Sequence, residues 1–170
     1  MKNLQHKSNL VKPFRSCYHT RMPTLIRNKK IHLDYELLEQ FEAGVELFGF
    51  EVKSLRNNHG SLEGAYAIVR GCEAFLIGAH IPPFQQANTP EKYDPYRNRR
   101  LLLTKKELAR LAEAEREKGL TIAPISWYTS RKRVKIGIAI ARGKKKFDKR
   151  ETLKKKDAAR DIARDLREKD

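Results

Sequence analysis

The sequence predicts a small β-barrel or an α+β domain, mainly β-stranded with flanking helices. Residues 134–140 alternate strictly between branched apolar residues and small or charged ones, which is typical of a strand with one face in the core. This strand is expected to pair with residues 121–129 across a turn at 130–133. Apolar runs at 65–69 and 74–79 flank a Gly-Cys dipeptide, which predicts a second hairpin. Helical patterns interrupt the strands irregularly, so a doubly wound sheet is not indicated.

The first 27 of the 170 residues form a basic segment unlike the rest of the chain. It contains six Lys or Arg, no acidic residue and no sustained periodicity. Transit peptides are also basic, but this segment is not rich in serine. We expect a disordered basic arm rather than a targeting peptide. Alternatively, Met22 is the true start, and the residues before it are not translated.

The folded core is expected over residues 28–141. Residues 34–41 could form either a strand or a helix, because their apolar positions match neither the two-residue period of a strand nor the helical period of about 3.6 residues. The next segment is expected to form a short helix, since its apolar residues recur at helical spacing: Val45, Phe48, Val52 and Leu55.

A long loop and a capped helix follow the hairpin predicted over residues 65–79. Pro82–Arg100 contains four prolines, and loops of this length are usually functional or mobile. Thr104 and Glu107 have the spacing of a capping box, in which each side chain satisfies a free backbone N–H of the first turn. We expect Gly119 to end this helix in a left-handed conformation.

The composition changes after Ala141. Residues 142–170 contain 13 Lys or Arg and 7 Asp or Glu, and aliphatic residues are nearly absent. Such a segment cannot bury enough apolar surface to fold alone. We therefore expect a basic C-terminal tail that is disordered when free and helical on its target.

The charge of the chain predicts a polyanionic partner. There are 37 Lys or Arg against 21 Asp or Glu, a net charge of +16, and nucleic acid is the commonest partner of so basic a protein. A membrane surface is the rival partner, but no apolar run approaches the length of a spanning helix. Cys17 and Cys72 fit neither a disulfide framework nor a metal site, which favours a reducing cytoplasm.

Sequence motifs for catalysis are missing. The chain has no Gly-rich phosphate loop, no nucleophile elbow and no His/Cys metal cluster, and its five histidines are scattered singly. We therefore expect no enzymatic activity, no metal and no cofactor.

Cations and aromatic residues are interleaved along the core. Lys53 and Arg56 lie near one face of the predicted short helix, where they can take adjacent phosphates. Three further cations, Arg97, Arg99 and Arg100, close the proline-rich loop, and aromatic residues lie among them: Tyr35, Tyr93, Tyr96, Trp127 and Tyr128. Aromatic faces stack on unpaired bases while cations bind phosphates. The alternative for Trp127 and Tyr128 is a place in the core and at the edge of a strand, so these residues alone predict a basic binding module.

Several blocks of the sequence, in order and at close to the family's spacing, resemble the SsrA-binding (small protein B) family from residue 28 to about 167. The blocks are Asn28-Lys-Lys30, Asp34-Tyr35, Phe41-Glu-Ala-Gly44, Gly49–Arg56, Asp94-Pro95, Arg99–Leu103, Lys118–Thr121 and Gly143–Glu151.

This resemblance implies a fold and a partner. The fold is an OB-like antiparallel β-barrel with flanking helices, in which residues 34–41 form a strand. The partner is the tRNA-like domain of tmRNA, which a monomeric, cytoplasmic adaptor brings to stalled ribosomes. The basic tail would then lie in the empty mRNA channel at the decoding centre of the small subunit. A general RNA-binding protein and an RNA-processing enzyme are the alternatives.

The resemblance and the basic helix together predict the site residues. RNA contacts are expected from Asn28, Lys29, Tyr35, Glu42, Lys53 and Arg56. Ribosome contacts are expected from the tail residues Gly143, Lys144, Lys145, Asp148, Lys149 and Arg150, with Gly143 as a hinge.

Glu42 is the informative residue of this set, because phosphate repels a carboxylate. We expect it to accept a hydrogen bond from a base or a 2′-OH; the alternative is a structural carboxylate in a turn. Leu102 matches a core or interface position of the family, and we expect a core role. Two features depart from the family: the N-terminal extension, and Phe147, which replaces a residue that is often His or Tyr.

Overall fold

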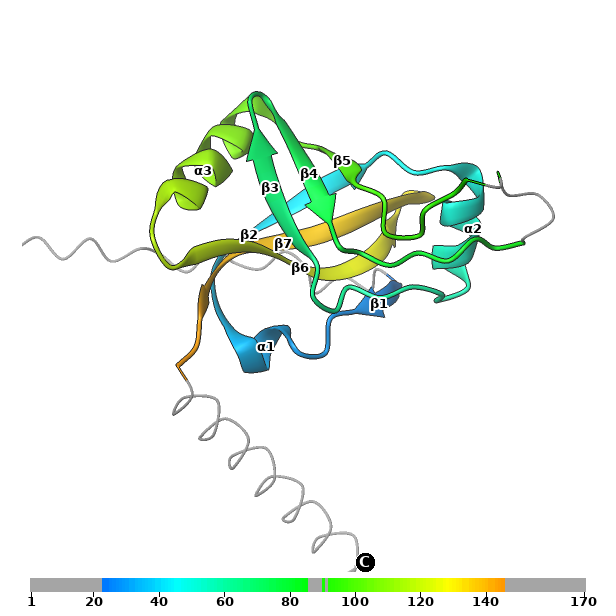
Figure 1. Cartoon of the computed structure of the whole chain (residues 1–170), viewed down its shortest axis with the longest axis horizontal. Coiled ribbons are helices and arrows are strands. Elements are labelled where there is room, and N and C mark those ends of the chain that lie inside the picture. The colour runs from blue at the N-terminus through cyan, green and yellow to red at the C-terminus, as the bar shows by residue number, and fades with distance from the viewer. Residues whose placement is uncertain (1–22, 86–89, 91, 146–170) are drawn as a thin grey trace, which may run out of the picture.

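The computed structural model describes residues 23–85, 90 and 92–145, and these form seven strands and three helices (Figure 1). In chain order the elements are β1 (Thr24–Arg27), α1 (Ile31–Asp34), β2 (Tyr35–Val45), α2 (Gly49–Arg56), β3 (Tyr66–Arg70), β4 (Glu73–Ile77), β5 (Arg99–Leu102), α3 (Lys105–Arg116), β6 (Leu120–Ser130) and β7 (Arg133–Gly143).

The strand pairings form a ring. They run from β2 through β7, β6, β3, β4 and β5 and return to β2, all antiparallel, while β1 pairs with residues 126–128 of β6, beyond the β3 contact at Ile122. The prediction of a mainly antiparallel β domain with flanking helices is confirmed. The ring has six strands, one more than the five of an OB-fold.

The ring closes weakly between β3 and β6. One residue pair, Ala67 with Ile122, joins these two strands. Beyond it, helix α3 packs against both β3 and β6. The Glu115 carboxylate on α3 accepts a hydrogen bond from the Val69 backbone N–H at 2.9 Å. The helix thus takes the place of a neighbouring strand along this part of β3.

Residues on both faces of β7 are buried. Val134, Ile136, Ile138 and Ile140 point into the main core, as the alternation predicts. After Lys135 the opposite face carries small residues, and towards its end Ala141 packs with Ile31 of α1 and Ala123 of β6 in a second apolar cluster. Small side chains are needed there because α1 lies against this face of the sheet.

The predicted elements near β2 and α2 are partly shifted. Residues 34–41 form a strand, as the resemblance implies, and the strand continues to Val45. The predicted helix is shorter than its apolar spacing suggests: it begins at Gly49, where the Glu51 carboxylate accepts a hydrogen bond from the Phe48 N–H at 2.8 Å. Val45 therefore belongs to the sheet.

The predicted capping box is confirmed. Thr104 Oγ1 accepts a hydrogen bond from the Glu107 N–H at 3.4 Å, and the Glu107 carboxylate accepts one from the Thr104 N–H at 2.8 Å. The helix ends at Arg116, earlier than expected. Glu117 is extended, and Gly119 adopts the predicted left-handed conformation (φ +88°) two residues later.

The folded region is wider than 28–141. Thr24–Arg27 forms β1 because its two apolar residues, Leu25 and Ile26, pack on the main core, and the basic composition of this segment concealed them. The other end extends through Gly143. The arm before residue 23 and the tail after residue 145 lie outside the described residues.

The β6–β7 turn has an unusual backbone. Arg131 and Lys132, its two central residues, have φ values of +46° and +67°. Two-residue hairpins of type I′ require this sign at both positions and usually contain Asn-Gly. Other residues lose about 1–2 kcal/mol each in this conformation.

Candidate nucleic-acid interface

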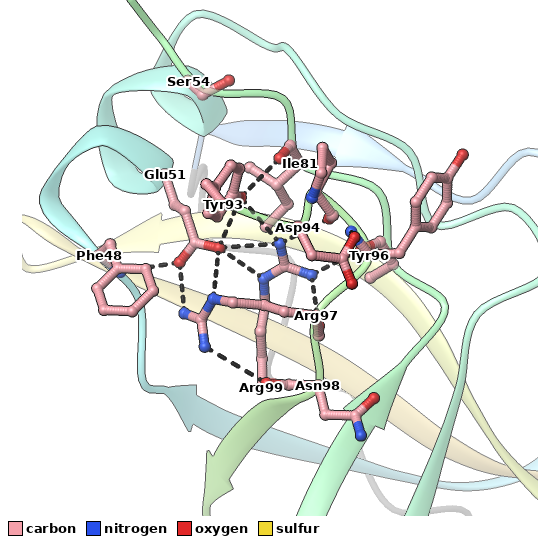
Figure 2. Close-up of polar contacts among 12 residues, drawn as sticks. Phe48, Glu51, Ser54, Ile81, Tyr93, Asp94, Tyr96, Arg97, Asn98 and Arg99 are labelled. Carbon is pink, nitrogen blue, oxygen red and sulfur yellow. Dashed lines mark hydrogen bonds and ion pairs between the residues drawn. The ribbon is translucent and has the colours of Figure 1, made fainter. Parts of the chain in front are cut away.

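A buried carboxylate joins α2 to the segment before β5 (Figure 2). The Glu51 side chain is fully buried, and two guanidinium groups bind it. Arg97 Nη2 lies 2.6 Å from Glu51 Oε2, and Arg99 Nη2 lies 2.9 Å from Glu51 Oε1. Arg99 is itself fully buried. A buried charge cluster of this kind is stable when its remaining hydrogen-bonding groups also have partners.

Those partners are backbone carbonyls and one phenol. Arg99 donates to the carbonyl oxygens of Ala79 at 2.7 Å and Pro95 at 2.9 Å. The Tyr93 hydroxyl lies 2.9 Å from Glu51 Oε1 and 2.8 Å from the Ile81 carbonyl oxygen. Burial and the Glu51 carboxylate raise the pKa of Tyr93 to about 12, so the phenol keeps its proton. We name Glu51, Tyr93, Arg97 and Arg99 the Glu51 cluster.

The Glu51 cluster corrects part of the predicted RNA face. Arg99 cannot bind RNA because it is buried, and Arg97 and Tyr93 are largely committed to Glu51. Trp127 is also fully buried in the core, as its alternative interpretation held. The sequence grouped these residues with RNA contacts because it does not reveal that one buried carboxylate binds the cations.

Strand β5 alternates around the buried Arg99. Arg99 and Leu101 point inward, and Arg100 and Leu102 point outward. Leu102 is 54% exposed, so the predicted core role is wrong. Next to it, Gly44 on β2 leaves room for the leucine, since a Cβ at Gly44 would lie 3.2 Å from Leu102 Cβ.

Leu102 borders a groove of about 590 Å³ that contains Glu42. Lys135 of β7 forms an ion pair with Glu42 of β2, and both side chains are about one-third exposed. Burial alone would raise the pKa of Glu42, but hydrogen bonds from Lys135 and Tyr128 outweigh it and hold the pKa below its ordinary value. The groove therefore presents a charged carboxylate, a cation and an apolar side chain, and we name it the Glu42 groove.

The predicted contacts Asn28, Lys29 and Tyr35 lie elsewhere on the domain. Tyr35 is seven residues from Glu42 on β2, about 24 Å away by the rise of a strand. The Asn28 amide donates to the carbonyl oxygen of Pro124 at 3.1 Å, so it also holds the connection between β1 and α1. Lys29 is exposed and Tyr35 is half-buried.

The predicted tail contacts begin at the end of β7. Gly143 pairs with Tyr35 within the sheet. Lys144 donates its backbone N–H to the Asp34 carbonyl oxygen at 2.9 Å and its ammonium to the His32 carbonyl oxygen at 2.8 Å, which ties the start of the tail to α1. Lys145 is exposed. Asp148, Lys149 and Arg150, with Phe147, lie outside the described residues.

Sequence reasoning missed Lys135 as the partner of Glu42. The two residues are 93 positions apart, and their contact follows from the register that places Glu42 opposite Gly137 and Gly44 opposite Lys135. The sequence did show one lysine on the polar face of an alternating strand. This pattern does not reveal which strand lies next to that lysine.

Among the described residues there is neither a group of three or more potential metal ligands nor a helix long and apolar enough to cross a membrane. The chain has a net charge of +16, and its described part is a mainly β domain with a groove of mixed charge. These features define a small basic protein that binds nucleic acid. The family model described as SmpB protein matches residues 25–168, and the chain belongs to the SmpB family.

Similar proteins agree with this assignment. The SsrA-binding protein of Ralstonia pickettii (strain 12J) is 45% identical over 146 residues, covering 86% of this chain and 99% of that protein. The SsrA-binding protein of Latilactobacillus sakei subsp. sakei (strain 23K) is 46% identical, covering 84% of this chain and 91% of that protein. A chain from the solved structure "tmRNA-SmpB: a journey to the center of the bacterial ribosome" has a TM-score of 0.62 and 36% identity, covering 77% of this chain and 95% of that chain.

The Glu51 cluster predicts an acid-sensitive fold. Burial alone would raise the pKa of Glu51, but hydrogen bonds from Arg97 and Phe48 and the charge of Arg99 hold it below its ordinary value. This stabilisation is complete above the unfolded pKa of about 4.3 and is lost as the pH falls through the lower folded value. Glu51→Gln should reduce the free energy of unfolding at pH 7 by about 3–5 kcal/mol. It should also flatten the loss of stability below about pH 4.3, as measured by urea unfolding.

The exposed Glu46→Gln is the matched control for Glu51→Gln. It removes one carboxylate from the segment preceding α2 and should change the free energy of unfolding by less than about 0.5 kcal/mol at either pH. Equal stability curves for the two variants would show that the buried carboxylate does not hold α2 to the loop.

Proposed function

We propose that this protein binds the tRNA-like domain of tmRNA and delivers it to stalled ribosomes for trans-translation. The family match carries the proposal, because it extends over both the β domain and the basic tail. The relatives are named SsrA-binding proteins, and the similar solved chain belongs to a tmRNA-SmpB study. The protein acts in the cytoplasm as a monomeric adaptor and has no catalytic step of its own.

The Glu42 groove has the chemistry to select a folded RNA. Lys135 neutralises one carboxylate oxygen of Glu42 and reduces its repulsion from phosphate. The two carboxylate oxygens retain acceptor capacity for a base N–H or a 2′-OH, which phosphate contacts alone do not read. The exposed Leu102 offers an apolar surface beside these polar groups. Selectivity for one RNA would come from this combination rather than from net charge.

The tail supplies the second part of the proposed function. Its cations, including Lys149 and Arg150, would bind ribosomal RNA phosphates in the empty mRNA channel near the decoding centre. Lys144 supports this division, since its two hydrogen bonds to α1 set the point from which the tail leaves the domain. The β domain would hold the tmRNA while the tail reports the absence of mRNA.

Binding selectivity tests the proposed function directly. Fluorescence anisotropy should show that the tRNA-like half of tmRNA binds about two orders of magnitude more tightly than an elongator tRNA or an unrelated hairpin of equal length, near physiological salt. Equal affinity for all three RNAs would indicate non-specific electrostatic binding and refute the assignment to tmRNA.

A charge-neutral variant of Glu42 separates recognition from electrostatics. Removing this carboxylate should strengthen binding if the groove attracts phosphates alone, because Lys135 is then released. If Glu42 accepts a specific hydrogen bond, Glu42→Gln should weaken binding of the tmRNA fragment by about 10- to 100-fold with the fold intact. Glu39→Gln is the control: it removes another half-exposed carboxylate of β2, one paired with Arg110. Unchanged or stronger binding by Glu42→Gln would contradict the recognition role.

Truncation after Lys145 tests the role of the tail. Deleting residues 142–170, the boundary that the sequence suggests, would cut into β7, whereas this truncation keeps the contacts of Lys144 with α1. The affinity for the tmRNA fragment should stay within about threefold, and peptide tagging on stalled ribosomes should fall to background. Asp148→Ala, Lys149→Ala and Arg150→Ala combined should give the same result at full length. Loss of RNA binding together with tagging would refute this division of labour.

A further inference from the structure

The β6–β7 turn presents three consecutive cations. Arg131, Lys132 and Arg133 follow one another directly, and all three side chains are exposed. The first two occupy the positions with positive φ. Glycine and asparagine suit this backbone best, so long basic side chains here are not explained by the conformation of the turn. Strain of this kind is found where a side chain is needed for contact with a ligand.

A fourth cation holds the turn to α2. Arg56 Nη2 donates a hydrogen bond to the Lys132 carbonyl oxygen at 2.9 Å, which joins the last residue of the helix to the hairpin 76 positions later (Figure 1). Lys53, one helical turn earlier, is exposed as well. We name Arg56, Arg131, Lys132 and Arg133 the turn patch.

Among the described residues, the cations of the turn patch have no ion-pair partner. Several exposed cations elsewhere on the surface do have one, as in Lys30 with Glu63, Arg100 with Glu73 and Arg110 with Glu39. Over residues 23–85, 90 and 92–145, no ion pair includes a member of the turn patch. Four cations without ion-pair partners in this part of the chain are the electrostatic feature that a polyanion site needs, and they do not form an internal salt-bridge network.

The turn patch continues the Glu42 groove. Arg133 and Lys135 are two residues apart on β7, so they lie on the same face of the strand about 7 Å apart. Lys135 is the partner of Glu42. An RNA strand that reaches Glu42 therefore meets Arg133 next along the protein surface and the rest of the turn beyond it.

We propose that the turn patch binds backbone phosphates of the same RNA that occupies the Glu42 groove, which rests on the function proposed above. Arg131, Lys132 and Arg133 supply the contacts. Arg56 is a positioning residue, because its guanidinium fixes the carbonyl of Lys132 and so the direction of the turn. The contacts carry no sequence information; they set the orientation of the RNA, while the Glu42 groove selects it.

The double variant Arg131→Asn, Lys132→Gly tests this proposal, since it removes two charges and installs the favoured Asn-Gly turn. Its thermal midpoint should equal or exceed that of the wild type. Its affinity for the tRNA-like half of tmRNA should fall by about tenfold or more, and the slope of log K against log salt should decrease by about 1.4–1.8. Loss of binding by a protein at least as stable as the wild type separates contact from folding.

The double variant Arg116→Gln, Lys118→Gln is the matched control. It removes the same charge from the end of α3, next to the start of β6 and about 34 Å along that strand from the turn. It should change the affinity by less than about threefold. Equal losses in both double variants would overturn the proposal and leave net charge as the cause.

A comparison of RNAs keeps this test separate from the proposed function. If the wild type binds the tmRNA fragment no better than an unrelated hairpin, the assignment to tmRNA fails. Comparing the affinities of the two double variants for that hairpin then still tests whether the turn patch binds phosphates. A salt slope that the turn variant leaves unchanged on both RNAs would overturn the turn patch, even where tmRNA selectivity holds.

Discussion

The buried carboxylate of Glu51 is the interaction on which the surface of this domain depends. It binds the Tyr93 phenol and the Arg97 guanidinium from the segment between β4 and β5, and the guanidinium of Arg99, the first residue of β5. Its own backbone belongs to α2. Arg99 must point inward to reach it, so alternate residues of β5 face outward, and Leu102 arrives at the Glu42 groove. The arrangement of the exposed Glu42 groove thus depends on the buried ion pair of Glu51 with Arg99.

The distribution of ion pairs divides the basic surface into different regions. Exposed pairs such as Arg110 with Glu39 contribute little to stability, but they cancel charge locally. Where a pair borders a groove, as Lys135 with Glu42 does, a cation and a carboxylate lie side by side on the surface. At the β6–β7 turn the described residues form no ion pair, so the cations there are not neutralised in this way. The net charge of +16 is therefore unevenly distributed over the surface, which the total for the chain does not reveal.

Local patterns in the sequence predicted local structure well. The capping box at Thr104, the hairpins and the alternation in β7 depend on neighbours a few residues apart, and all were found. What failed depends on distant partners. Burial of Arg99 requires Glu51, 48 positions away, and the exposure of Leu102 follows from it. The contact of Lys135 with Glu42 needs the register of two strands, and β1 was concealed by a basic composition that overrode its two apolar residues.

The weak closure between β3 and β6 bears on how the protein avoids self-association. An unpaired strand edge is a template for another chain, and aggregation through such edges is a general hazard of β proteins. Here α3 covers the gap, and Glu115 occupies the Val69 N–H that a foreign strand would otherwise bind. Damage to α3 would therefore expose an edge of β3 to intermolecular strand pairing.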